Sequence, residues 1–359
     1  MSLVKANTYQ DASGGSNAVF SGVASPVGSM GFRNRIINGD MRIDQRNNGA
    51  SISNPVGGAY SVDRMQIYGN VASKFTAQRN AGSVTPPAGF TNYLGITSSS
   101  AYSVPSTERY AVVHNFEGFN TADFSWGTAN AQAATLSFWV RSSLTGTFGA
   151  AFRNGTTGSP SYPFTYTISA ANTWEFKTVT VAGPTTGSWA SDNTCSVQLW
   201  FSLGTGTTFS GTAGAWAASD FSSATGTTSV VGTNGATFYI TGVQLEAGTV
   251  ASPFERVDYG RQLIQCQRYY WRGTSANLNF SSYAIGALMS WSIGFPVTMR
   301  ATPTFNSSLS GITYSGCSSL GWAQPNVNAG RLIVQSTTIA TNCSFTWGAG
   351  DYIDAAIEL

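Results

Sequence analysis

Residues 243–272, VQLEAGTVASPFERVDYGRQLIQCQRYYWR, separate one long β-rich region from another. The stretch contains the one convincing helical pattern in the chain, because apolar residues recur there at the i, i+3 and i+7 spacing of a helix face. These residues are Leu263, Cys266 and Tyr270. Asp258 occupies the N-cap position and Gly273 the position of a C-terminal stop. The pattern predicts a helix of three to four turns over 258–272.

Charge collects in two places along the chain. Residues 33–46, RNRIINGDMRIDQR, and residues 255–272 together hold eight of the eighteen basic residues. Between them, 47–254 holds seven basic and eight acidic residues over a long, weakly charged region. Because the ends of a domain often lie close together, we expect the two charged segments to meet at its root.

The weakly charged middle predicts an antiparallel sandwich. Five segments alternate apolar and polar residues with the period of two that is typical of half-buried strands. They are RYAVVHNFEGF (109–119), TLSFWVRS (135–142), WEFKTVTVAG (174–183), SVQLWFSLG (196–204) and ATFYITGVQLEAG (236–248). No strand–helix–strand alternation appears, so the sequence favours an all-β fold, a two-sheet jelly roll of about eight strands.

These patterns divide the chain into four segments. Residues 1–33 are Gly/Ser-rich and predict an extended arm, and residues 34–257 predict the jelly-roll sandwich. Residues 258–272 form the predicted helical neck. Residues 273–359, whose charged positions are very few before residue 351, predict a small C-terminal β-domain.

Composition excludes several classes of function. Only 9% of residues are charged and the net charge is +2, so nothing attracts the chain to nucleic acid or to an anionic membrane. Just three of the basic residues are lysines, which indicates structural arginines in ordered pairs. The sequence shows neither a signal peptide pattern nor an apolar run long enough to cross a membrane. The four cysteines predict buried thiols, although a disulfide between Cys317 and Cys343 stays open.

Four blocks in order resemble a family of bacteriophage tail fibre and receptor-binding proteins. They are NRIINGDMRIDQR…YSVDRM (34–65), VQLEAGTVASPFE (243–255), LIQCQRYYW (263–271) and FPVTMRATPTF (295–305). The resemblance implies a carbohydrate-binding-like jelly roll, a short helix and a variable β tip. It also implies a virion protein of the tail, assembled in the host cytoplasm, whose N-terminal arm attaches it to tail or baseplate proteins.

The same resemblance implies a homotrimer, and the helix then has a physical role. An isolated helix of this length is marginal in water, so three copies would bury Leu263, Cys266 and Tyr270 along a shared axis. We expect Arg261, Arg268 and Arg272 to pair with acidic groups of a neighbouring chain. The alternative is a linker helix that packs on its own sandwich.

Binding of a host surface glycan is the function that these features favour. Aromatic rings stack on the apolar faces of sugars, while Asn, Ser and Thr hydrogen-bond the hydroxyls. The tip offers Tyr283, Trp291, Tyr314, Trp322 and Trp347 with almost no charge, which suits an uncharged glycan. An alternative contact set is Trp126, Trp189 and Trp216 in the sandwich, where Trp139 and Trp174 are interpreted as packing residues.

Catalysis and metal binding have weaker support. His114 is the one histidine, the acids form no local cluster and no short repeat predicts a depolymerising β-helix, so we expect no enzyme activity. The resemblance to carbohydrate-binding modules suggests a structural calcium at Asp40 and Glu246, whereas the favoured interpretation is a salt bridge with Arg33, Arg42 or Arg46. The remaining alternatives are a connector or decoration protein without a receptor, and a glycan-depolymerising fibre.

Overall fold

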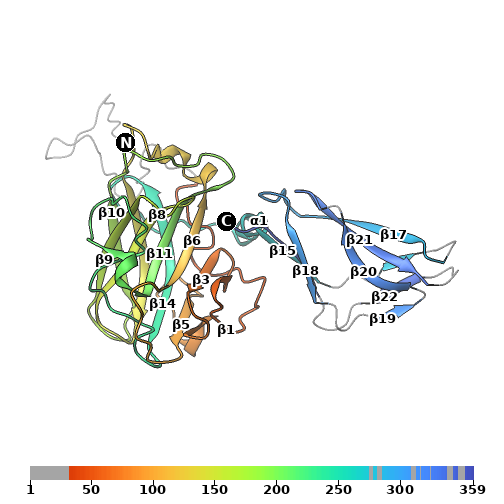
Figure 1. The fold of residues 1–359 in the computed structure, drawn as a ribbon, viewed down its shortest axis with the longest axis horizontal. Coiled ribbons are helices and arrows are strands. Elements are labelled where there is room, and N and C mark those ends of the chain that lie inside the picture. Colours follow the sequence, from red (N-terminus) through yellow and green to blue (C-terminus); the bar gives the residue numbers. More distant parts are fainter. Residues whose placement is uncertain are drawn as a thin grey trace, which may run out of the picture. The chain divides into compact units, whose positions relative to one another are not determined.

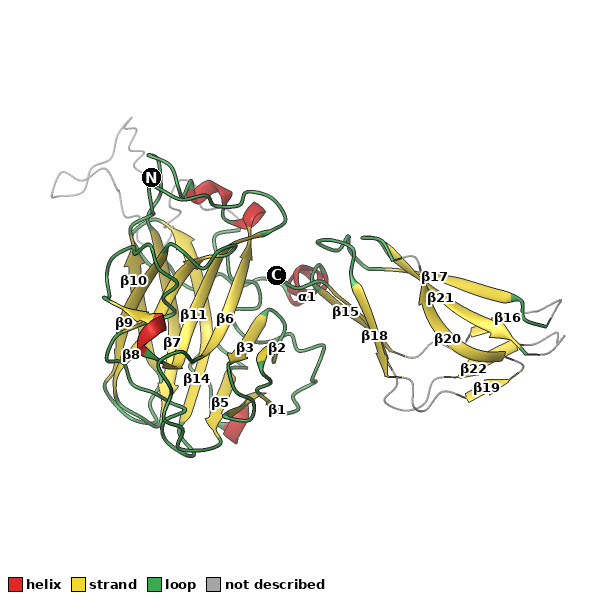
Figure 2. Cartoon of the chain, viewed as in Figure 1, coloured by secondary structure: helices red, strands yellow, loops and turns green. Residues whose placement is uncertain are grey.

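The computed structural model describes residues 32–274, 278–280, 285–308, 313–315, 317–323, 325–337, 343–346 and 352–359. Strands dominate this part of the chain (Figure 2), which confirms the all-β fold class. The predicted arm, 1–33, lies outside the described residues except for its last two. None of the described helices is long and apolar enough to span a membrane.

Two six-stranded antiparallel sheets form the sandwich (Figure 1). The first sheet has the order β1 (Ile52–Ser53), β4 (Phe75–Arg79), β5 (Leu94–Ser98), β14 (Thr237–Ala247), β7 (Ala134–Ser142) and β10 (Glu175–Val181). The second has the order β2 (Gly57–Tyr60), β3 (Met65–Gly69), β6 (Arg109–Glu117), β11 (Cys195–Thr205), β8 (Gly146–Asn154) and β9 (Ser161–Ile168). All five segments with period-two alternation are strands, as predicted.

The sandwich has more strands than the eight or so that the sequence predicts, because its shortest strands carry too little alternation to identify them. Strands β1 to β4 come from residues 52–79, where each has five residues or fewer. Two further strands, β12 (Ser210–Gly211) and β13 (Ser223–Ala224), pair in parallel in a loop region. Four single-turn 3₁₀ helices, η1 (Ala81–Ser83), η2 (Gly118–Asn120), η3 (Ala122–Phe124) and η4 (Thr207–Phe209), lie in the connections.

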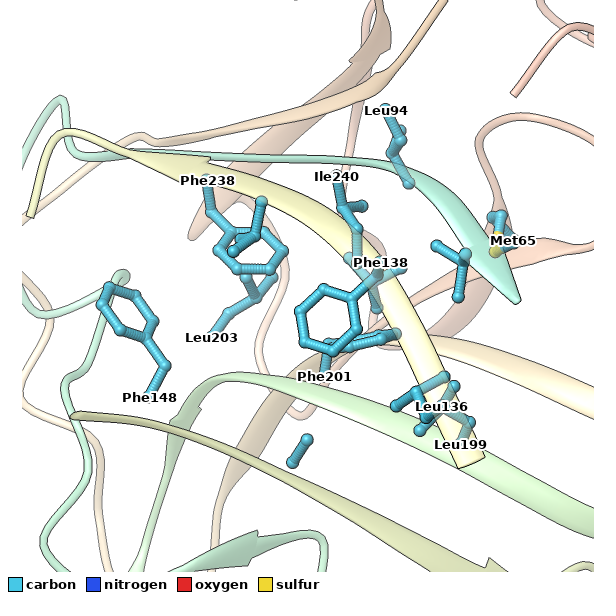
Figure 3. Close-up of a cluster of buried hydrophobic side chains, with 14 of the residues drawn as sticks. Met65, Leu94, Leu136, Phe138, Phe148, Leu199, Phe201, Leu203, Phe238 and Ile240 are labelled. Carbon is cyan, nitrogen blue, oxygen red and sulfur yellow. The ribbon is translucent and has the colours of Figure 1, made fainter. Parts of the chain in front are cut away.

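The apolar faces of the two sheets meet in one core. Figure 3 shows Leu136 and Phe138 of β7 beside Leu199 and Phe201 of β11, and all four side chains are buried. Phe138 contacts the Phe201 ring at a centroid distance of 5.0 Å, nearly edge to face. Burial of a phenylalanine side chain contributes roughly 1.5–3 kcal/mol, so this layer fixes which face of each strand points inward.

Helix α1 (Tyr259–Gln267) begins where the sequence predicted but ends earlier. The Asp258 carboxylate accepts hydrogen bonds from the backbone N–H groups of Gly260, at 2.9 Å, and Arg261, at 3.2 Å, as an N-cap does. The predicted continuation to residue 272 is wrong, because β15 (Tyr270–Thr274) pairs with β23 (Tyr352–Ala356). Aromatic residues fit a strand well, and Gly273 lies inside that strand and not at a helix stop.

The C-terminal region consists of three small antiparallel sheets in the described residues, so it is β-structured, as predicted. Their strand orders are β15–β23–β18 (Thr304–Ser308), β16 (Leu278–Phe280)–β22 (Cys343–Thr346)–β19 (Thr313–Ser315), and β17 (Leu288–Gly294)–β21 (Ala329–Ser336)–β20 (Cys317–Ala323).

The two charged segments meet, which confirms the expectation drawn from their spacing. The backbone N–H of Asn34 donates to Glu255 at 2.5 Å, and Arg42 donates to the carbonyl oxygen of Val257 at 2.7 Å. We call the ion pairs around this contact the charged seam. It comprises Arg46, Arg64, Arg268 and Arg272 with Glu117, Asp354 and Glu358.

Candidate functional site

A pocket of about 420 Å³ opens between two loops at one end of the sandwich. One loop follows β6 and includes η2 and η3, and the other joins β10 to β11. We call it the loop pocket, and it is lined by Thr121, Ala122, Ser125, Trp126, Thr128, Asn130, Trp189, Ala190, Ser191, Ser196 and Val197. No lining residue is charged, and the volume lies within the range of about 300–1,000 Å³ found for ligand sites.

The structure brings the alternative contact set of tryptophans together beside this pocket. Trp126 and Trp189 lie at a centroid distance of 5.1 Å, and Trp189 and Trp216 lie at 5.6 Å, both edge to face. Each indole N–H donates to a backbone carbonyl oxygen, from Trp126 to Gln132 at 2.9 Å for example. Because the rings are locked, they form a rigid aromatic wall, of which Trp126 and Trp189 line the pocket.

Polar groups around the loop pocket remain available to a ligand. The hydroxyls of Ser125 and Ser191 and the side-chain amide of Asn130 form no hydrogen bond with any residue that the structure describes, and Ser191 and Asn130 are exposed. A hydroxyl both donates and accepts, and an amide offers one acceptor and two donors. The arrangement can therefore satisfy the hydroxyl groups of a neutral sugar while the indoles contact its apolar face.

A second cavity, of about 350 Å³, lies on the outer face of the first sheet. We call it the outer groove, and it is lined by Phe90, Ser137, Trp139, Phe176, Gly242, Ser252, Pro253, Phe254 and Arg256. Trp139 of β7 and Phe176 of β10 are directly opposed in the sheet, with ring centroids 5.4 Å apart. The rings of Phe90 and Phe254 meet edge to face at 5.2 Å, and Arg256 lies 4.9 Å from the centre of Phe90.

Trp139 and Trp174 both pack against another aromatic ring, as interpreted from the sequence. The ring of Trp174 meets Tyr93 at 5.5 Å and its N–H donates to Thr85, and the ring of Trp139 meets Phe176 at 5.4 Å. Trp139 also lies on the outer face of its sheet and lines the outer groove, which the interpretation did not include. The sequence did carry the signal, because the period of two places Trp139 with Ser137 and Arg141, opposite the buried face of β7.

The predicted tip residues are only partly within the described structure. Trp291 lies on β17 with 50% of its surface exposed, opposite the buried Leu332 of β21. The backbones of Tyr314 and Trp322 lie in β19 and β20, and their side chains lie outside the described set. Tyr283 and Trp347 lie outside the described residues altogether.

The predicted neck residues are enclosed by their own chain. Cys266 is buried with Tyr269 and two isoleucines of the entry segment, and Leu263 packs against this cluster. Tyr270 is also buried, and its hydroxyl donates to Asp354 at 3.0 Å.

The partners predicted for Arg268 and Arg272 were wrong, since their carboxylates come from the same chain. Arg268 pairs with Glu117 at 2.5 Å and Arg272 with Asp354 at 3.5 Å. These acids lie far away in the sequence, at positions that the local pattern does not link to the helix.

The two residues considered for calcium are occupied by protein groups. Asp40 forms a salt bridge with Arg42 at 2.6 Å and accepts a hydrogen bond from Gln262 at 2.9 Å. Glu246 accepts from Gln244 and from both the N–H and the hydroxyl of Ser252. The salt bridge favoured for Asp40 is therefore present. The described residues contain no group of three His, Cys, Asp or Glu side chains that could hold a metal ion.

His114 is buried beside Phe116, at a centroid distance of 4.7 Å. Burial, with the nearby Arg64 guanidinium second, holds the pKa of His114 well below its usual range. The imidazole is therefore neutral and enclosed in the core of the sandwich.

No family model matches the sequence, and no curated protein matches it. Solved structures with a similar arrangement include the enzymatically active domain of bacteriophage CBA120 tailspike protein 4, with a TM-score of 0.32 and 12% identity over 60% of this chain. The chain spans about a fifth of that tailspike, since 21% of it is covered.

Carbohydrate-binding modules are also among the similar structures. The CBM22-2 xylan-binding domain of Paenibacillus barcinonensis Xyn10C has a TM-score of 0.28 and 10% identity, covering 56% of this chain and 96% of that one. The family 11 module of Clostridium thermocellum has a TM-score of 0.27 and 11% identity, covering 56% and 98%. At such scores the likeness assigns neither a family nor a ligand.

Proposed function

We propose that this protein is a bacteriophage tail fibre or receptor-binding protein that binds an uncharged glycan of the host surface in the loop pocket. The observation that carries the proposal is a cavity of about 420 Å³ with two locked tryptophans, free hydroxyl and amide groups, and no charged side chain in its lining. An aromatic wall suits the apolar face of a pyranose, and the polar groups suit its hydroxyls.

The tip provides a second candidate contact with the host. Trp291 on β17 is half exposed, and Leu288 on the same strand and Ile285 in the preceding turn have 70% and 67% of their surfaces exposed. Large apolar groups gathered at an edge strand commonly mark a binding surface. In this proposal the tip and the loop pocket are alternatives that one mutational comparison separates.

The proposal of a trimer is based on the family resemblance and on two exposed side chains of helix α1. Cys266 and Tyr270 are used within the chain, whereas Tyr259 and Ile264 keep 55% and 49% of their surfaces exposed. We place the contact between chains at these two residues. Several weak sugar sites on one fibre would then reinforce one another, because linked sites bind with a raised effective concentration.

Glycan-array binding of the full-length protein tests the function and its location. We expect binding to neutral glycans that Trp189→Ala and Asn130→Ala abolish, and that Phe119→Ala, an exposed control outside the pocket, leaves unchanged. If Trp291→Ala loses glycan binding while Trp189→Ala binds as the wild type does, the site lies in the tip and not in the loop pocket. Absence of glycan and host-cell binding would refute the receptor proposal and favour a connector in the virion.

The same samples test the absence of catalysis and the trimer. Incubation with a bound polysaccharide should release no reducing ends, and release would show a depolymerase. Native mass spectrometry should show a trimer that Ile264→Glu weakens, whereas Val56→Glu, at another exposed position, should not. A stable monomer at micromolar concentration would contradict the trimer.

A further inference from the structure

We propose that the outer groove is a second, separate binding site and that it takes a sugar bearing a carboxylate, such as a uronic or sialic acid unit of a surface polysaccharide. The proposal does not depend on the loop pocket, which lies at the end of the sandwich among other elements. It rests on three features of the groove, namely its aromatic walls, the indole N–H of Trp139, which has no acceptor among the described residues, and the guanidinium of Arg256, which forms no ion pair there.

The walls of the groove are aromatic and remain accessible. Phe176 has 48% of its surface exposed on the edge strand β10, and Trp139 beside it is half-buried. Phe90 and Phe254 reach the groove from two loops on the same side of the sheet. Exposed rings arranged around a cavity of about 350 Å³ give a pyranose an apolar surface on which to stack.

Trp139 differs from every other tryptophan of the sandwich. The indole N–H groups of Trp126, Trp174, Trp189, Trp200 and Trp216 all donate to protein acceptors. The N–H of Trp139 has no acceptor among the residues that the structure describes, although its ring is partly buried. This N–H is not among the buried polar atoms, so it is open to water, and an oxygen of a ligand in the groove can take the place of that water.

Arg256 brings an uncompensated positive charge to the same groove. Its guanidinium stacks near Phe90 and Phe254, at 4.9 and 5.8 Å from the ring centres, and forms no ion pair within the described parts of the chain. Two acidic residues close to the lining residues in the sequence have other partners, since Glu246 accepts hydrogen bonds from Ser252 and Gln244 and Glu255 accepts one from the backbone N–H of Asn34. A planar guanidinium held against rings matches a carboxylate with two parallel hydrogen bonds.

Glycine is required at the floor of the groove. Gly242 has a φ of +60°, and a Cβ atom there would lie 2.7 Å from the ring of Phe90 and 3.2 Å from that of Trp139. This position lies within the irregular register between β14 and β7. The irregular register lets the two rings approach the backbone at the floor of the cavity, which Trp139 and Arg256 both line.

Isothermal titration with matched acidic and neutral oligosaccharides tests the inference. The probes are oligogalacturonates, their fully methyl-esterified counterparts, and a panel of sialylated oligosaccharides. We expect at least one acidic probe to bind full-length wild-type protein and its neutral counterpart to bind at least about tenfold more weakly, since a hydrogen bond to a charged group is worth at least that factor. Added salt should weaken binding.

Two variants and two controls locate the site. Arg256→Gln should lower the affinity for the acidic probe by about tenfold or more, and Trp139→Phe should lower it while the aromatic wall is kept. Arg141→Gln, on the same strand but outside the groove, and Trp189→Ala, in the loop pocket, should bind the acidic probe as wild type does. Equal binding of acid and ester, an unchanged affinity of Arg256→Gln, or no binding across the acidic panel would overturn the proposal.

Discussion

Replacing Glu117 with alanine removes the carboxylate that joins strand β6 to the end of helix α1. Glu117 is 1% exposed, and its two oxygens accept hydrogen bonds from Arg268, at 2.5 and 3.0 Å, and from the hydroxyl of Tyr269, at 2.5 Å. Among the described residues, no other carboxylate accepts a hydrogen bond from Arg268 or from the hydroxyl of Tyr269. The substitution therefore leaves the buried hydroxyl of Tyr269 without its acceptor and leaves the Arg268 guanidinium with only the carbonyl oxygen of Thr298, at 3.3 Å.

The expected loss of stability follows from these contacts. An unsatisfied buried hydroxyl costs about 1–3 kcal/mol, and a hydrogen bond to a charged group contributes about 1.5–3 kcal/mol. The Arg268 side chain keeps 30% of its surface exposed, so water replaces part of what it loses. We expect Glu117→Ala to lower the free energy of unfolding by about 3 kcal/mol, and the melting temperature by several degrees.

Urea unfolding followed by tryptophan fluorescence measures this difference. The control is Lys177→Ala, which removes an ion pair with Glu175 at 2.6 Å on an edge strand and should cost less than about 1 kcal/mol. A cycle with Tyr269→Phe should show that the two substitutions are coupled, because both break the same hydrogen bond. If Glu117→Ala unfolds at the same urea concentration as Lys177→Ala, the seam does not join β6 to α1 as argued.

Three further predictions follow from single residues. Burial raises the pKa of Asp63 from 3.8 to about 6, so between about pH 4 and 6 the folded state binds more protons than the unfolded state. The free energy of unfolding of the wild type, relative to that of Asp63→Asn, should therefore fall as the pH rises from about 4 to 6, and unfolding titrations at several pH values measure this. Burial also raises the pKa of Cys195 to about 11 and that of Cys266 well above its usual value, so both thiols stay protonated at pH 8. Because iodoacetamide reacts with the thiolate, peptide mapping should find neither cysteine alkylated at pH 8 until denaturant is added. Gly39→Ala would press a Cβ atom against a carbonyl oxygen of β14 and should lower the melting temperature, unlike Gly294→Ala, where nothing lies within 4 Å.

The long strands of the sandwich could be predicted because their alternation is a local property. In β7, Leu136, Phe138 and Val140 point into the core, and the residues between them do not. Strands β1 to β4 could not be predicted in the same way, since two to five residues carry too little alternation to identify a strand. The end of α1 was missed for that reason too, because β23 lies about eighty residues further along the chain.

The candidate site was predictable in composition but not in geometry. The Gly/Ser context of Trp126, Trp189 and Trp216 indicated loop positions, and the structure gathers these three rings. Their cavity depends on two loops about sixty residues apart, which no local signal connects. The sequence favours a packing role for Trp139, because a tryptophan in a strand is usually buried. The residues two positions away on the same face of the strand, Ser137 and Arg141, are polar, and this indicated the outer face of the sheet.

The charged helix between two weakly charged β regions is explained by the seam. Arg46, Arg64 and Arg272 each combine a carboxylate partner with a tyrosine ring, and Arg64 lies 3.7 Å from the centre of Tyr269. A lysine cannot make the planar stack and the forked hydrogen bonds together, which accounts for the preference for arginine. Since unpaired buried charges are costly, displacing one of these segments against the others would be unfavourable. The charges thus stabilise the packing of residues 33–46, helix α1 and the last strand, β23, against one another. The sugar-binding surfaces proposed above consist of uncharged and aromatic residues. Arg256 is the exception, and in our proposal it gives the outer groove its selectivity.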